Sequence, residues 1–198
     1  MKRVLIILLV IIASFPAQAQ DKGAKNSVMF QWGGESAVSR SMDSGFESGP
    51  YGDLYDMYEK RFQEQKGGSV IALALFHNFA KRLSVGVYAA YSHASGDYYD
   101  PVEDKVLYRK KARGCYLVPQ ARFIWMDGYV LKLFSGAGYG VGRETSKHDK
   151  DAQPVITKSV WSVVPVGAHF IFADISWDIE VEVGSVMSGV KIGIGYNF

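Results

Sequence analysis

The stretch KIGIGYNF, residues 191–198, decides the fold of this chain. Apolar side chains alternate in it with Lys, Gly and Asn, so Ile192, Ile194, Tyr196 and Phe198 share one face of an extended strand. A strand of a soluble sheet rarely ends on an exposed Phe, whereas an aromatic ring suits the interface between a bilayer and water. The stretch therefore predicts a β-strand embedded in a membrane.

The same residues resemble the closing-strand signal of bacterial outer-membrane β-barrels. That signal has a polar residue, a glycine, an aromatic and a terminal aromatic at fixed positions, and here they are Lys191, Gly193, Tyr196 and Phe198. The resemblance implies insertion into the outer membrane by the barrel-assembly machinery, with outer-membrane lipid around the barrel. The residues also leave open the C-terminal strand of a soluble sandwich.

The beginning of the sequence has the pattern of a secretory signal peptide. Met1-Lys2-Arg3 is basic, residues 4–15 form a nearly unbroken apolar run, and Ala17-Gln18-Ala19 is a small-residue cleavage site. The apolar run is too short for a spanning helix, which needs about 20 residues. We expect residues 1–19 to be cleaved and residues 20–198 to form one exported barrel domain.

Charge and cysteine content exclude several classes of function. Removal of Lys2 and Arg3 takes the formal net charge from +2 to 2 − 2 = 0, so no nucleic-acid partner is expected. Cys115 is the only cysteine, which excludes an internal disulfide. The His spacing predicts no metal site, and nothing in the sequence indicates a cofactor.

Segments of alternating polarity recur along the expected mature chain and predict about eight strands, the smallest number that closes an outer-membrane barrel. They cover residues 27–33, 69–80, 83–94, 112–126, 129–142, 159–172, 175–184 and 189–198.

The connections between these segments alternate in length. Lys81-Arg82, Asp127-Gly128 and Ala173-Asp174 are tight, and Asp-Gly is a strong hairpin signal. The other connections span residues 34–68, 95–111, 143–158 and, more briefly, 185–188. We therefore predict an all-β, antiparallel up-and-down transmembrane β-barrel with short periplasmic turns and longer extracellular loops.

The strand of residues 175–183 separates Ile, Trp and Val on one face from Ser, Asp and Glu on the other. Aromatic residues near the strand ends, mostly on the apolar faces, resemble the girdles of membrane barrels, so we expect the apolar face outside. These aromatics are Trp32, Phe79, Trp125, Tyr129, Phe172, Trp177 and Phe198.

The charged faces should then line a narrow interior, where ions must be paired. We expect an interior ion-pair network formed by Arg122, Lys132, Asp178, Glu180, Glu182 and Lys191. Two interpretations stay open: these side chains fill the lumen, or they form a gated ion path.

The first long connection contains a helical stripe over residues 53–62. Phe46, Tyr51, Tyr55 and Tyr58 would suit a recognition surface for a protein or glycan partner, and the alternative is a loop that packs its own aromatics.

Two hypotheses of function follow from the resemblance to OmpA/OmpX-like barrels. The first is a non-enzymatic barrel with a filled polar lumen that serves envelope structure, surface interaction or weak solute passage. The alternative is a lipid-modifying enzyme of the lipid A acyltransferase or deacylase type, with Ser92, His93 and Asp97 as candidate catalytic residues.

Overall fold

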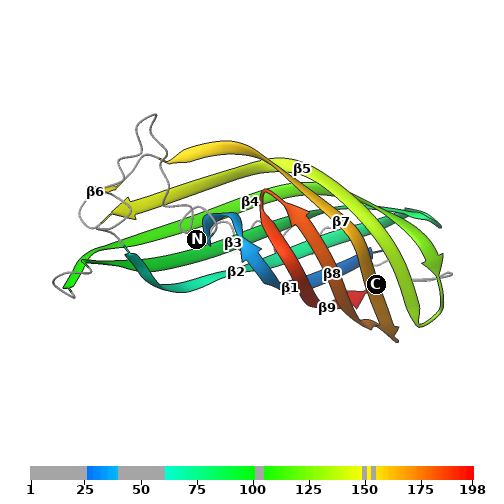
Figure 1. Cartoon of the computed structure of the whole chain (residues 1–198). Coiled ribbons are helices and arrows are strands. Elements are labelled where there is room, and N and C mark those ends of the chain that lie inside the picture. The colour runs from blue at the N-terminus through cyan, green and yellow to red at the C-terminus, as the bar shows by residue number, and fades with distance from the viewer. Residues whose placement is uncertain (1–25, 40–60, 101–104, 149–150, 153–154) are drawn as a thin grey trace.

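The computed structural model describes residues 26–39, 61–100, 105–148, 151–152 and 155–198. Nearly all of them form antiparallel strands (Figure 1). The strands are β1 (Asn26–Ser36), β2 (Arg61–Ala80), β3 (Leu83–Asp100), β4 (Lys105–Asp127), β5 (Leu131–His148), β6 (Asp151–Ala152), β7 (Ile156–Phe172), β8 (Ile175–Gly184) and β9 (Met187–Asn197).

The strands close into a barrel in which each long strand pairs with its neighbours in the chain. β4 pairs with β5 and β1 pairs with β9, so the ring has no open edge, and the two-residue β6 is attached to β5 alone. Eight strands therefore form the barrel, as the sequence predicts. The seam lies between β1 and β9, where Val28 is opposite Tyr196 and Trp32 is opposite Ile192.

The turns at the end where β1 begins and β9 ends are short. Lys81-Arg82 and Ala173-Asp174 form the tight turns that the sequence predicts, and Ala173 adopts a positive φ of 55°. The Asp127-Gly128 prediction is wrong by a few residues, because β4 includes Asp127 and β5 begins at Leu131. A register shift between Ile124 and Met126 brings Asp127 opposite Lys132, and their side chains form an ion pair of 3.1 Å.

At the opposite end the strands differ in length, and the predicted loop bounds are wrong there. β1, β8 and β9 have 11, 10 and 11 residues, whereas β2 to β5 have 18 to 23. The segments predicted as loops at 95–111 and 143–158 are largely strand, because ladder hydrogen bonds between β3, β4 and β5 continue through them. We call the protruding ends of β2 to β5, at residues 61–69, 93–100, 105–113 and 143–148, the outer wall (Figure 1).

The first long connection is described only in part. Ala37–Ser39 is helical and follows β1 directly. Of the helical stripe predicted over 53–62, residues 53–60 lie outside the described residues. Arg61 and Phe62 belong to β2 and pair with Tyr99 and Tyr98, so the prediction is wrong at that end.

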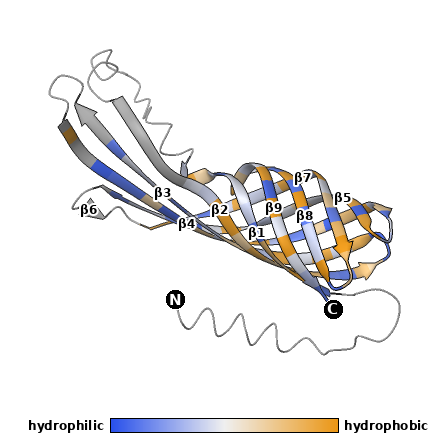
Figure 2. Ribbon diagram, turned by 90° about the horizontal axis from the view of Figure 1, so that it is seen from below, coloured by the Kyte–Doolittle hydropathy of each residue, from blue (hydrophilic) through white to orange (hydrophobic). Residues whose placement is uncertain are grey.

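The barrel is apolar outside and polar inside, as the sequence predicts. On β8, Trp177 and Ile179 are about half exposed, whereas Asp178 and Glu180 are buried. The girdle aromatics are exposed apart from Phe198, which is half-buried. Figure 2 shows apolar residues gathered on the barrel and hydrophilic ones on the long ends of β3 and β4. No helix among the described residues is long and apolar enough to cross a membrane, a finding that does not bear on strands.

The inward face of β5 carries glycines where large side chains of β4 cross the lumen. A Cβ at Gly138 would lie 2.7 Å from the backbone oxygen of Pro119 and 2.8 Å from Cγ1 of Val118. Ala137, the next residue, is exposed on the outer face.

We predict that Gly138→Val lowers the free energy of unfolding by about 1–3 kcal/mol, because the added side chain overpacks the interior. Ala137→Val is the matched control and should leave it within about 0.5 kcal/mol, because its side chain faces outward. Urea unfolding of the refolded barrel in detergent micelles measures both changes. Equal changes for the two variants would contradict the inward assignment of Gly138.

Candidate functional site

The barrel interior holds a cluster of buried charges from three strands. Arg122 of β4 contacts Glu180 of β8 at 2.5 Å. Lys191 of β9 lies 3.0 Å from Glu180 and 2.8 Å from Glu182. All four side chains are at most 5% exposed. We call these four residues the interior network; its two cations and two carboxylates carry no net charge.

Neutral side chains complete the hydrogen bonds of the two carboxylates. Gln31 donates to Glu180 at 2.8 Å, and Tyr88 and Ser162 donate to Glu182 at 2.9 and 2.7 Å. These three donors were not among the residues expected from the sequence. Their signal was strand parity, because each lies on the inward face of its strand.

Aromatic rings fill the space beside the cations. The Arg122 guanidinium lies 3.6 Å from the ring centroid of Phe76 and 4.5 Å from that of Phe134. The Lys191 ammonium lies 5.0 Å from the ring of Tyr88. Cations over aromatic faces gain a further attraction when water is excluded. The interior at this level is therefore occupied by packed side chains.

Lys132 and Asp178 do not join the interior network. Lys132 is the second residue of β5 and pairs with Asp127 beside the turn, where both side chains are about a quarter exposed. Asp178 is buried, and its Oδ1 lies 2.6 Å from Nδ1 of His169 on β7. The strand register explains both positions. Near the turn end, Lys132 lies opposite Asp127 of β4 and His169 of β7, and Asp178 lies opposite His169.

The residues of the closing-strand signal lie at the seam. Lys191 and Gly193 point inward, and Gly193 lies beside Gln31 of β1. Tyr196 is half exposed and stacks on Phe198, with ring centroids 6.2 Å apart. Asn26 and Phe198 exchange two backbone hydrogen bonds of 2.9 Å, which join the beginning of β1 to the residue that follows β9.

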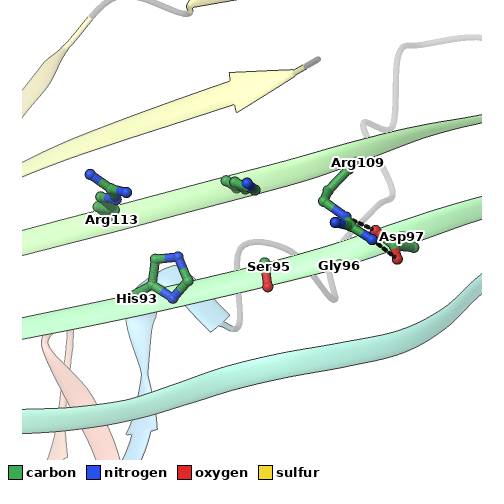
Figure 3. Close-up of a pocket in the computed structure, with 7 residues that line it drawn as sticks. His93, Ser95, Gly96, Asp97, Arg109 and Arg113 are labelled. Atoms are coloured by element: carbon green, nitrogen blue, oxygen red, sulfur yellow. Dashed lines mark hydrogen bonds and ion pairs between the residues drawn. The ribbon is translucent and has the colours of Figure 1, made fainter.

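The three candidate catalytic residues do not converge. Ser92 is buried on the inward face of β3, whereas His93 and Asp97 have the opposite parity and line a pocket on the outer wall (Figure 3). Asp97 accepts hydrogen bonds of 2.5 and 2.7 Å from the Arg109 guanidinium. A nucleophile and its base must be within hydrogen-bond reach, and strand geometry keeps Ser92 and His93 on opposite faces.

The remaining predicted sites are only partly within the described residues. Phe46, Tyr51, Tyr55 and Tyr58 lie outside them, so the recognition surface stays a prediction. Cys115 is exposed on the outer face of β4. Within the described ranges, no group of three or more His, Cys, Asp and Glu side chains could hold a metal ion.

We predict that Lys191→Met lowers the free energy of unfolding by about 3–5 kcal/mol, because it leaves a buried carboxylate without its cation. Lys132→Met removes the same charge beside the turn and should cost less than about 1 kcal/mol. Adding Glu182→Gln to Lys191→Met should recover part of the loss. Equal losses for the two single variants in urea unfolding would contradict the contribution assigned to the interior network.

Three comparisons relate the chain to known proteins. No protein-family model matches it, and no curated protein does. Among solved structures, the chain resembles Ail, the attachment invasion locus protein of Yersinia pestis, solved in complex with the heparin analogue sucrose octasulfate. The TM-score is 0.52 at 12% identity, and the match covers 89% of this chain and all of Ail.

Two further solved structures show lower similarity. The N-terminal β-barrel domain of Pseudomonas aeruginosa OprF matches with a TM-score of 0.47 and 11% identity, over 89% of this chain and all of that domain. OprG of the same organism matches with a TM-score of 0.45 and 14% identity, over 89% of this chain and 97% of OprG. With its closed ring of eight strands and its apolar outer surface, the chain has the fold of the small eight-stranded bacterial outer-membrane β-barrels.

Proposed function

We propose that this protein is a non-enzymatic outer-membrane barrel whose lumen does not conduct and whose outer wall serves interactions at the cell surface. The observation that carries the proposal is the interior network, in which Arg122, Lys191, Glu180 and Glu182 meet across the lumen. A role in solute passage needs an open path at this level, and packed side chains occupy it.

The packing of the lumen continues on both sides of the interior network. On one side Phe76 and Phe134 are at most 5% exposed. On the other, Val38, Val186 and Met187 are buried, and the Ala37 amide donates to the carbonyl of Val186. An eight-stranded barrel leaves just enough interior for side chains. Passage would therefore require several buried contacts to break together.

The outer wall favours a surface role. β2 to β5 extend beyond the barrel on one side, whereas β8, β9 and β1 end early (Figure 2). A wall of paired strands offers a rigid extracellular surface that costs little conformational entropy to present. A protein or glycan partner on this side is part of the proposal, with Phe46, Tyr51, Tyr55 and Tyr58 as the predicted contribution of the first connection.

Two processing steps belong to the same proposal. The pattern of residues 1–19 supports export with cleavage before a mature domain of residues 20–198. The signal of Lys191, Gly193, Tyr196 and Phe198 supports handling by the barrel-assembly machinery. The enzymatic alternative is disfavoured, because Ser92 and His93 point to opposite faces of β3.

We expect the purified barrel to show no steady unitary conductance in planar lipid bilayers at moderate voltage, because the interior network occupies the lumen. A variant with Arg122, Glu180 and Lys191 all replaced by Ala should admit ions if it folds, which heat-modifiable gel mobility checks. A stable conductance of the unaltered protein would contradict the proposal.

We also expect His93→Ala to leave the acylation of lipid A unchanged in cells that express the protein, because Ser92 lies on the opposite face of β3 and the Arg109 guanidinium holds both oxygens of Asp97. Mass spectrometry of extracted lipid A compares the variant, the unaltered protein and cells without it. An acylation pattern that depends on His93 would support the enzymatic alternative instead.

A further inference from the structure

The outer faces of β3, β4 and β5 change character at one row of register partners. Tyr91, Cys115 and Arg143 lie side by side in this row. Towards the end of the barrel with the short turns the outward residues are apolar, and Leu117 and Val141 are half exposed. In a bilayer such a change marks the boundary between acyl chains and headgroups. The boundary row therefore lies at the outer edge of the membrane.

Beyond the boundary row the outer wall is basic. Lys111 and Lys147 lie directly opposite each other, and the next row towards the membrane contains Arg113. With Arg143 of the boundary row they form a cluster of four exposed cations on two neighbouring strands. We call these four residues the basic cluster. Neighbouring strands are about 4.8 Å apart, and residues two apart along a strand are about 7 Å apart.

The two carboxylates described near the basic cluster, those of Glu144 and Asp97, do not neutralise it. Glu144 has the opposite parity and accepts from Tyr116 at 2.7 Å, with Lys158 at 2.8 Å. Asp97 shares the outer face, but the Arg109 guanidinium holds both of its oxygens (Figure 3). Like charges opposite each other destabilise a strand pair. A bound anion would remove this cost, so the basic cluster has the character of an anion site.

An apolar groove begins where the basic cluster ends. It has a volume of about 640 Å³ and is lined by Ile71, Ala89, Tyr91, Leu117 and Val141. Arg143 and Cys115 of the boundary row line the end of the groove that is nearest to the basic cluster. Ile71, Ala89, Leu117 and Val141 belong to the outward faces, on the side of the boundary row that faces acyl chains. The groove and the basic cluster are therefore continuous parts of one surface.

We propose that this surface binds one phosphorylated, multiply acylated lipid of the outer leaflet. One acyl chain lies in the groove, and the phosphate is bound by Lys111, Arg113, Arg143 and Lys147. Arg and Lys are the usual partners of phosphate, and Arg can donate two parallel hydrogen bonds to it. The combination of groove and cations selects an amphiphile over a soluble anion. The inference needs only the membrane location and stands whether or not the lumen conducts.

The test uses the refolded barrel in detergent micelles and native mass spectrometry, with bisphosphorylated lipid A as the probe. We expect one retained lipid per barrel and about tenfold weaker retention for Lys111→Gln/Lys147→Gln. The matched control, Lys81→Gln/Arg82→Gln, removes the same charge at the opposite end of the barrel and should retain the lipid. Gel mobility with and without heating confirms that each variant is folded.

Two further arms test the apolar half of the site. Ala89→Trp fills the groove and should weaken retention, whereas Ala137→Trp, outward on β5 and outside the groove, should not. Dephosphorylated lipid A should bind more weakly than the phosphorylated probe.

Three outcomes would overturn the proposal. If both charge variants weakened lipid retention equally, the lipid would be held by the overall charge of the barrel and not by the basic cluster. If dephosphorylated and phosphorylated lipid A were retained equally, the cations would contribute nothing to binding. If sucrose octasulfate displaced the lipid and Ala89→Trp still retained it fully, the basic cluster would be a site for a soluble polyanion.

Discussion

Two carboxylates buried in the lumen, Glu180 and Glu182, set the constraint on which this barrel depends. Each ion would cost several kcal/mol to bury alone, so the strands must meet in a register that brings cations to them. Lys191 on β9 and Arg122 on β4 meet that requirement from opposite sides of the interior. The outer surface needs no such match, because lipid accepts any apolar side chain. The register of the barrel is therefore specified mainly from within.

Strand parity is the reason that most of the fold could be predicted. A period of two assigns every residue of β8 to the lumen or the lipid once one face is known, and the girdle aromatics identify that face. The same reasoning brought Lys191 opposite the acids of β8. It missed Gln31, Tyr88 and Ser162, because uncharged inward residues carry no signal of partnership until the strands are placed side by side.

The outer wall and the turns were harder to predict from the sequence, and the reasons are physical. Residues such as Ser95, Gly96 and Asp97 have the composition of a loop, yet the ladder between β3 and β4 holds them extended. Cross-strand hydrogen bonds overrode local preference there. The extended backbone of β3 also directs Ser92 and His93 to opposite faces, although their proximity in sequence had suggested a catalytic site. Adjacent residues on a strand point to opposite faces, so Ser92 and His93 are poor partners in catalysis.

Lys191 also ties the closure of the ring to the charge balance of the interior. It belongs to β9, which lies between β8 and β1, and it is the cation paired with Glu182. A barrel that lacked β9 would hold that carboxylate without its cation. The strand that completes the hydrogen-bond ring therefore also completes the charge balance of the lumen.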